Sequence, residues 1–383
     1  MSATLLVASD ARLATPAEHR DRPLHVVQIG FFEDSLGRAP ERLLDDWPTL
    51  VDVAECASRA GVRVSVLQTC TYEGTIARNG VDYHFAPRGS SWGPMLRELH
   101  ADVFHVHGLD FPAQTQALAR IAAGVPILLQ DHASRPPRLW RRSLFKRSSA
   151  LIDGVAFSAR EQAEPFLACR LLQKVAIFEV PESTSRFEPG DRPQAREATG
   201  LDGEPSVLWV GHLNRNKDPL AVLEGVERAA RTLGRLALYC CFGEGPLLGE
   251  VRRRIAARPL LRGRVHLLGR VPHRQVELLM RAADVFVLGS HRESCGNALL
   301  EALACGLPPV VTDIPSFRKL TAGAAVGALW PCGDAEALCN ALVSVASHLG
   351  EQTRAAVRAH FDRELSFASV GAKLRTIYEE LVS

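Results

Sequence analysis

The stretch of sequence that decides the fold runs from residue 283 to residue 315 and reads ADVFVLGSHRESCGNALLEALACGLPPVVTDIP. Its apolar run Val285–Leu288 is typical of a strand that is buried on both faces of a parallel sheet. A polar loop follows. Gly296 then opens a predicted helix that continues to about Cys305, where a glycine and two prolines end it. A second apolar run at Pro309–Thr312 completes a predicted βαβ unit, with the helix N-terminus at the carboxyl end of a strand.

This helix start is a position at which open α/β sheets bind ligands. The free N–H groups of residues 294–298 carry a partial positive charge that suits a phosphate group. Glu293 and Glu301 bracket the turn, eight residues apart, and their carboxylates would hold hydroxyl-bearing parts of a ligand because they repel phosphate. A ligand with phosphate in its middle and hydroxyls at both ends is a nucleotide-sugar. The alternative is a solvated loop glutamate and a surface glutamate of an ordinary α/β protein.

The spacing Glu293-x7-Glu301, with a glycine between and Ala-Leu-Ala-Cys-Gly after it, resembles the Glu-x7-Glu motif of retaining GT-B glycosyltransferases, family 4 type. The resemblance implies that Glu293 contacts hydroxyls of the donor sugar and that Glu301 holds the ribose. It also implies that main-chain groups after the first glutamate bind the sugar and the diphosphate. The residues concerned are Ser294, Cys295, Gly296 and Asn297.

A second candidate donor loop is Gly211–Asp218, which precedes a predicted helix at Pro219–Leu233. A cation before a helix N-terminus is unfavourable unless an anion binds there, so Lys217 indicates phosphate. The loop resembles the family's Gly-Arg-Leu-x3-Lys motif, which implies that Lys217 grips the donor diphosphate. His212 stands where the family has the arginine. The resemblance also places Val271 at a position where main-chain groups of the family contact the nucleobase.

Histidines mark the N-terminal half. His132 follows the predicted strand Val125–Gln130, so its imidazole would project into the crevice, and it matches a family histidine beside the donor sugar. A capping residue of the loop is the alternative. His105 and His107 share a face of their strand, and no third ligand at suitable spacing supports a metal site. The resemblance places His107 near the acceptor and leaves His105 as a core histidine.

The loop after the first predicted strand, residues 31–40, reads FFEDSLGRAP where the family carries a Gly-Gly pair near the diphosphate. Its charged residues Asp34 and Arg38 either face the acceptor or form a local ion pair on the surface. Both interpretations stay open on the sequence.

A length of 383 residues predicts two domains. The resemblance implies an α/β GT-B fold, with two Rossmann-like domains facing across a cleft and a C-terminal helix crossing back to the N-terminal domain. We expect a disordered tail at residues 1–22, an N-terminal acceptor domain at residues 23–180 plus helix 366–383, and a C-terminal nucleotide-sugar donor domain at residues 181–365. Residues 80–86 are expected to form an edge strand of the first sheet.

The composition predicts a cytoplasmic protein. Nine cysteines, an odd number without a Cys-x-x-Cys pair, favour reduced thiols, and no apolar run is long enough to span a bilayer. A net charge of +2 gives no reason to expect a nucleic acid partner. Residues 136–150 interleave five Arg and Lys residues with Trp140, Leu144 and Phe145. This pattern suits peripheral contact with the inner face of a membrane, or a solvated helix with an apolar packing stripe.

The predicted function is retaining transfer of a sugar from a nucleoside-diphosphate sugar, UDP rather than GDP, to a hydroxyl of a glycan, a lipid-linked saccharide or a small molecule. His132, Glu293 and Lys217 are the expected catalytic residues. No Asp-x-Asp motif occurs, so we expect neither a metal nor a resident cofactor. Two alternatives stay open, a GT-B nucleotide-sugar epimerase and a non-catalytic nucleotide-sugar-binding partner subunit.

Overall fold

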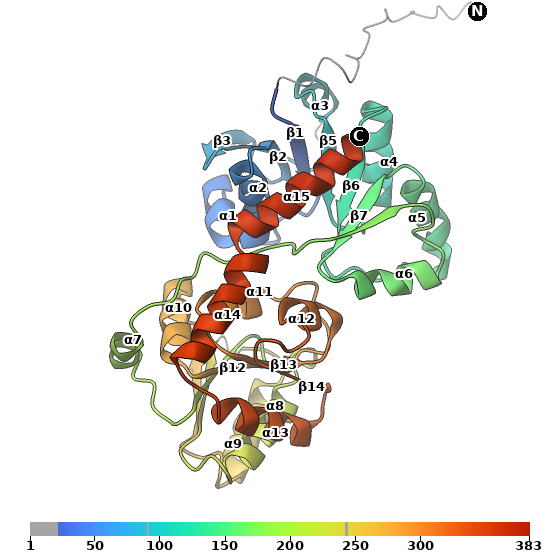
Figure 1. The fold of residues 1–383 in the computed structure, drawn as a ribbon. Helices are drawn as coiled ribbons and strands as arrows, with labels where there is room; N and C mark the ends of the chain where they lie inside the picture. The colour runs from blue at the N-terminus through green and yellow to red at the C-terminus, as the bar shows by residue number, and fades with distance from the viewer. Residues whose placement is uncertain (1–21, 90–91, 242–243) are drawn as a thin grey trace, which may run out of the picture.

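The computed structural model describes residues 22–89, 92–241 and 244–383. Within these ranges the chain forms an eight-stranded and a six-stranded sheet, each flanked by helices (Figure 1). The prediction of an α/β fold with two Rossmann-like domains is confirmed. The tail expected at residues 1–22 lies outside the described residues, except for Arg22.

The N-terminal sheet has the strand order β3-β4-β2-β1-β5-β6-β7-β8. Every pair of neighbours is parallel except β3 and β4. Apolar strands explain why the centre of the sheet is buried on both faces. The strands are β1 (His25–Gly30), β2 (Arg63–Thr69), β3 (Gly74–Arg78), β4 (Val81–Ala86), β5 (Val103–His107), β6 (Ile127–Gln130), β7 (Gly154–Phe157) and β8 (Ala176–Glu179).

The expectation of an edge strand at residues 80–86 is wrong, because β3 pairs antiparallel with β4 and takes the edge. Asn79 and Gly80 connect the two strands, and both have positive φ angles of 51° and 78°. An Asn-Gly pair with this backbone is a strong hairpin signal, so the sequence contained the sign of the missing strand.

Helices cover both faces of this sheet. Buried side chains of α1, α2 and α15 form one core with the strands, and those of α3, α4, α5 and α6 form the other. The N-terminal helices are α1 (Pro40–Asp46), α2 (Pro48–Arg59), α3 (Gly93–Glu98), α4 (Pro112–Ile121), α5 (Arg142–Ser149) and α6 (Glu164–Ala168), with 3-10 helices η1 (Leu139–Arg141) and η2 (Arg160–Ala163).

The C-terminal sheet is parallel throughout, with the order β11-β10-β9-β12-β13-β14 around a single apolar core. Its strands are β9 (Ser206–Val210), β10 (Ala237–Cys241), β11 (Val265–Gly269), β12 (Val285–Leu288), β13 (Pro309–Thr312) and β14 (Ala328–Trp330). Its helices are α7 (Arg192–Thr199), α8 (Pro219–Ala229), α9 (Leu248–Ala257), α10 (His273–Ala282), α11 (Asn297–Ala304), α12 (Pro315–Leu320), α13 (Ala335–Ala346) and α14 (Glu351–Glu364).

The segment between β8 and α7 links the two domains and is fixed to α2. Ser183 Oγ donates a hydrogen bond to Asp52 Oδ2 at 3.0 Å, and Arg186 Nη2 donates to Glu55 Oε2 at 2.8 Å. These bonds hold the start of the linker against the N-terminal domain.

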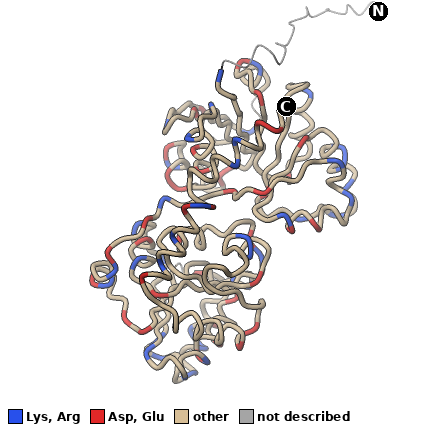
Figure 2. The backbone as a smooth tube through the Cα atoms, viewed as in Figure 1, with Lys and Arg blue, Asp and Glu red and all other residues tan. Residues whose placement is uncertain are grey.

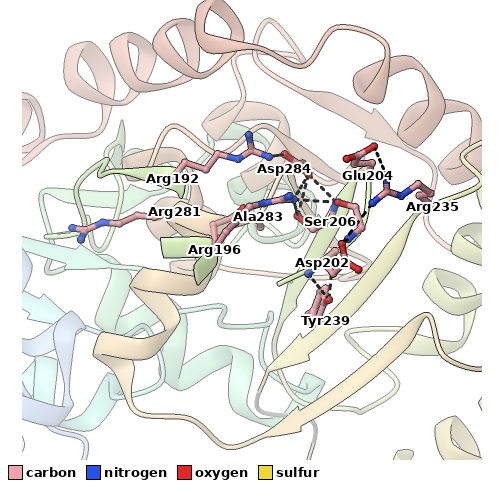
Figure 3. Close-up of polar contacts among 12 residues, drawn as sticks. Arg192, Arg196, Asp202, Glu204, Ser206, Arg235, Tyr239, Arg281, Ala283 and Asp284 are labelled. Atoms are coloured by element: carbon pink, nitrogen blue, oxygen red, sulfur yellow. Dashed lines mark hydrogen bonds and ion pairs between the residues drawn. The ribbon is translucent and has the colours of Figure 1, made fainter. Parts of the chain in front are cut away.

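The other end of the linker is fixed by Asp284, at the start of β12 (Figure 3). Its carboxylate accepts hydrogen bonds from Arg192 and Arg196 of α7 and from the backbone N–H of Ser206. The linker therefore joins two points that are each tied to their own domain.

The last helix, α15 (Phe367–Val382), follows α14 and lies across the N-terminal domain (Figure 1). It packs closely on α2 because Gly371 has no side chain at the contact. A Cβ atom on Gly371 would lie 2.2 Å from the Cys56 carbonyl oxygen.

We expect Gly371→Ala to lower the free energy of unfolding by about 1–3 kcal/mol, because overpacking at this backbone contact outweighs the helix propensity that alanine adds. Gly249→Ala in α9 is the matched control, since nothing lies within 4 Å of its added Cβ. Chemical denaturation followed by circular dichroism measures both. Equal stability changes in the two variants would contradict the close packing of α15 on α2.

Candidate active site

The site is built around the start of α11, which follows the loop after β12. Gly296 caps this helix with a φ of 107°, and a Cβ atom there would lie 2.6 Å from Phe317 Cε1. Glycine meets both the backbone and the space requirement. Among the described residues no side chain caps this N-terminus, so its first backbone N–H groups can bind a ligand.

Two predicted donor residues meet beside this helix start. Lys217 lies in the loop between β9 and α8, and Glu293 lies in the loop after β12. The Lys217 ammonium forms an ion pair with Oε1 of Glu293, and the two side chains are only 19% and 16% exposed. The structure thus brings together two opposite charges from loops that are far apart in the sequence.

Glu301 projects from α11 toward the start of α10. Its Oε1 lies 2.6 Å from Nε2 of His273, the first residue of α10. The hydrogen bond to Glu301 raises the pKa of His273 above its ordinary value. Sequence reasoning missed His273, although its position two residues after Val271 was a signal.

The other predicted donor residues differ in what they can offer a ligand. Cys295 is completely buried in the C-terminal core, so only its main chain can contact a donor. Ser294 is also buried, and its Oγ donates to the Asp131 carbonyl at 3.4 Å. Val271 packs partly buried against the same core, and His212 is exposed in its loop.

Contacts between the domains hold the Glu293 loop against the loop that carries His132. Arg292 donates to the carbonyls of Ala133 and Ser134. Gln162 of η2 donates from Nε2 to the Glu293 carbonyl at 3.0 Å and to the Ser294 carbonyl at 2.8 Å. Neither Arg292 nor Gln162 was singled out from the sequence, because their partners are backbone groups of the opposite domain.

A cavity of about 360 Å³ opens beside Glu293. It is lined by the loop after β6, by η2 and α6, by the Glu293 loop and by the start of α12. Its volume lies in the range of small-molecule sites.

His132 lies at the end of β6, as predicted, and both of its ring nitrogens have partners. Nδ1 contacts the carboxylate of Glu182 in the linker, and Nε2 lies 3.1 Å from His107 Nδ1. His107, which the resemblance places near the acceptor, lies behind His132 and is almost completely buried. His105 is fully buried, and its Nδ1 lies 2.8 Å from the Tyr378 hydroxyl.

Asp34 and Arg38 form the local ion pair that was one of the two interpretations of their loop. Arg38 Nη2 and Nε donate to the Asp34 carboxylate at 2.9 Å and 3.0 Å. The Arg38 guanidinium holds the pKa of Asp34 well below its usual range. A second contact joins Arg38 to Asp46 of α1.

Across the part of the chain that the structure describes, no three His, Cys, Asp or Glu side chains are grouped so that they could hold a metal ion. None of its described helices is long and apolar enough to cross a membrane.

Comparison with known proteins matches part of the chain to a protein family and finds related enzymes. Residues 191–358 match the family model of glycosyl transferases group 1. The 2-deoxystreptamine N-acetyl-D-glucosaminyltransferase of Streptomyces fradiae is 28% identical over 275 residues, which cover 67% of this chain and 63% of that protein, less than two thirds of its length. The phosphatidyl-myo-inositol mannosyltransferase of Mycobacterium leprae (strain TN) is 26% identical over 379 residues, which cover 94% of this chain and 92% of that protein.

Among solved structures, Anabaena Alr3699/HepE in complex with UDP and glucose superposes with a TM-score of 0.64 at 15% identity, covering 92% of this chain and 99% of that chain. This likeness shows the fold. The matched family region contains Lys217, Glu293 and Glu301, the residues that carried the resemblance in the sequence. Most of the C-terminal domain therefore matches the glycosyl transferases group 1, and the chain as a whole has the two-domain GT-B fold.

Proposed function

We propose that the chain transfers a sugar from a nucleoside-diphosphate sugar to a hydroxyl acceptor, with retention at the anomeric carbon and without a metal. The observation that carries the proposal is the meeting of Lys217 and Glu293 beside the uncapped start of α11. A cation and free helix amides suit a diphosphate, and a carboxylate beside them suits sugar hydroxyls.

In this proposal the donor exchanges partners with the ion pair. The diphosphate attracts the Lys217 ammonium and the amides of α11, and the sugar hydroxyls donate hydrogen bonds to Glu293. Glu301 accepts from the ribose hydroxyls in place of His273. His212 contributes to binding the diphosphate, and the main chain near Val271 contacts the base, for which uracil is favoured over guanine.

The chemical step breaks the bond between the anomeric carbon and the diphosphate oxygen. The acceptor oxygen attacks the same face of the sugar and forms the new glycosidic bond, and the departing phosphate takes the acceptor proton. Lys217, the amides of α11 and the charge of His132 stabilise the developing negative charge. Glu293 orients the sugar, and the contacts of Arg292 and Gln162 with the opposite domain exclude water.

The acceptor approaches from the N-terminal domain. Of the residues predicted on that side, His107 contacts His132 and would influence the acceptor only through it. Asp34 and Arg38 would have to break their ion pair to bind an acceptor. The named relatives act on different kinds of acceptor, a 2-deoxystreptamine compound and a phosphatidyl-myo-inositol. We propose a hydroxyl of a small molecule, a glycan or a lipid-linked saccharide.

A thermal-shift panel with UDP, GDP and their sugar conjugates tests the donor site. A nucleotide that binds the folded state at one hundred times its Kd adds about 2.7 kcal/mol of stability and so raises the Tm. We expect this shift with one base, unchanged by EDTA, and at least tenfold weaker binding in Lys217→Ala and Glu301→Ala. Each variant is compared with its own ligand-free Tm, because Lys217→Ala also leaves Glu293 without its partner.

Lys373→Ala in α15, remote from the helix start, should bind the nucleotide as the unchanged protein does. Absence of a shift with every nucleotide would contradict the donor site. A shift with conversion of the donor sugar to its epimer, or with no turnover against any acceptor, would favour the epimerase or the binding subunit.

We also propose that η1 and α5 contact an anionic membrane surface. Leu139 and Trp140 are 78% and 73% exposed, and the Arg141 guanidinium lies 5.2 Å from the Trp140 ring. Figure 2 shows Lys and Arg gathered on the side of the N-terminal domain occupied by α5. Exposed apolar side chains among cations fit an anionic lipid surface better than water.

Sedimentation with lipid vesicles tests this surface. We expect binding to vesicles that contain phosphatidylglycerol, little binding to pure phosphatidylcholine, and at least fivefold weaker binding in the double variant Leu139→Ser, Trp140→Ser. Tyr72→Ser, which removes an exposed aromatic side chain elsewhere on the domain, should bind normally. No binding to anionic vesicles, or equal binding by the double variant, would contradict the proposal.

A further inference from the structure

A line of polar side chains crosses the N-terminal sheet from the linker to the last helix. It begins at Glu182 in the linker and passes through His132 at the end of β6, His107 on β5 and Gln28 on β1 to Tyr378 on α15. The strand register explains the line, because β5 lies between β1 and β6 and all three strands are parallel. Its members lie at or under 8% exposure except His132, whose side chain is 17% exposed.

The contacts along the line are continuous. The Glu182 carboxylate contacts His132 Nδ1, and His132 Nε2 lies 3.1 Å from His107 Nδ1. His107 Nε2 lies 3.2 Å from Gln28 Oε1, and Gln28 Nε2 donates to the Tyr378 hydroxyl at 3.4 Å.

The hydrogen-bond donors and acceptors along this line determine which ring nitrogens of His107 and His132 carry protons. Gln28 offers its carbonyl oxygen to His107, so His107 Nε2 carries a proton and, in the neutral ring, Nδ1 is an acceptor. His132 Nε2 must then donate to His107 Nδ1. Because the Glu182 carboxylate lies against His132 Nδ1, it favours a proton on that nitrogen too, so that both nitrogens of His132 are protonated and the ring is an imidazolium.

The charges around His132 agree with this assignment. Burial alone would lower the pKa of His132, but Glu182 and then Asp131 raise it above its ordinary value. Burial, followed by the neighbouring histidines His105 and His132, holds the pKa of His107 far below its ordinary value, so this ring stays neutral. Both Glu182 and Asp131 also lie beside the two residues that follow Glu293. The Cys295 thiol lies against the Glu182 backbone, and the Asp131 carbonyl accepts from Ser294 Oγ.

We infer that Glu182 is a positioning residue that holds His132 as an imidazolium in the loop after β6, between two residues that line the cavity, Asp131 and Ala133. The linker thus fixes an ion pair whose imidazolium end lies in the loop after β6, the loop that Arg292 joins to the Glu293 loop. The kinetic consequence rests on the proposed function: this charge stabilises the departing diphosphate and leaves donor binding nearly unchanged. The charge state of His132 does not depend on that function.

NMR of protein labelled with 15N in its imidazole rings measures that charge state directly, and the His132 signals are assigned by their absence in His132→Gln. We expect His132 to titrate at a higher pH than an ordinary histidine. In Glu182→Gln its titration midpoint should fall by at least one pH unit, a tenfold change in proton affinity. Glu182→Asp should keep part of the effect. Glu188→Gln, which removes an exposed carboxylate from the same linker, should leave His132 unchanged.

Turnover of the nucleotide-sugar gives the second readout. We expect Glu182→Gln to lower kcat at least tenfold at pH 7.5 with less than a threefold change in the donor KM, and the loss should diminish at lower pH as His132 regains its proton. A His132 that titrates normally in the unchanged protein, or identically in Glu182→Gln, would overturn the inference.

The two proposals fail in different ways. If NMR shows an imidazolium that depends on Glu182 but the protein binds no nucleotide, this inference is supported and the proposed function is contradicted. If the protein turns over the donor while His132 is neutral, the proposed function is supported and this inference is contradicted. If Glu182→Gln does not fold, Glu182→Asp supplies the comparison, because it keeps the charge and moves the carboxylate away from the ring by one methylene.

Discussion

The ion pair between Lys217 and Glu293 is the interaction on which the rest of the site depends. Its two charges come from separate loops of the C-terminal domain and lie mostly out of water. Removal of either partner would leave the other charge partly buried and unpaired, which is unfavourable. Both loops are therefore held at the start of α11, where a ligand with its own negative charge and hydroxyls can take over both partners.

The second domain is arranged around this point. Arg292 and Gln162 make hydrogen bonds from opposite sides of the cleft, so the Glu293 loop and the His132 loop fix one another. The linker adds Glu182 behind His132. The candidate site is thus shared by both domains and by the segment between them, and a change in domain arrangement would alter the electrostatics of the proposed catalytic residues as well as access of water.

The fold and the C-terminal part of the site could be predicted because their signals are local. One βαβ stretch contains the strand, the helix start and both glutamates, and its backbone needs glycine at 296 whatever the rest of the chain does. The hairpin of β3 and β4 was not predicted, although the Asn79-Gly80 pair is a sequence signal for it.

What could not be predicted depends on how distant segments pack. Glu182 has no motif around it, and its importance comes only from the position of the linker behind β6. Gln162 and Arg292 bind backbone carbonyls, which leave no mark on the sequence. The polar partners of His105 and Gln28 come from α15, more than 200 residues later, because the Tyr378 hydroxyl contacts both side chains. Pairwise contacts of this kind require the tertiary structure.

A crystal structure with a bound nucleoside diphosphate tests the central claim most directly. The account predicts the diphosphate within hydrogen-bond distance of Lys217 Nζ and the first amides of α11, with the ribose hydroxyls on the Glu301 carboxylate. A diphosphate bound elsewhere, with the Lys217–Glu293 pair intact and Glu301 still on His273, would contradict it.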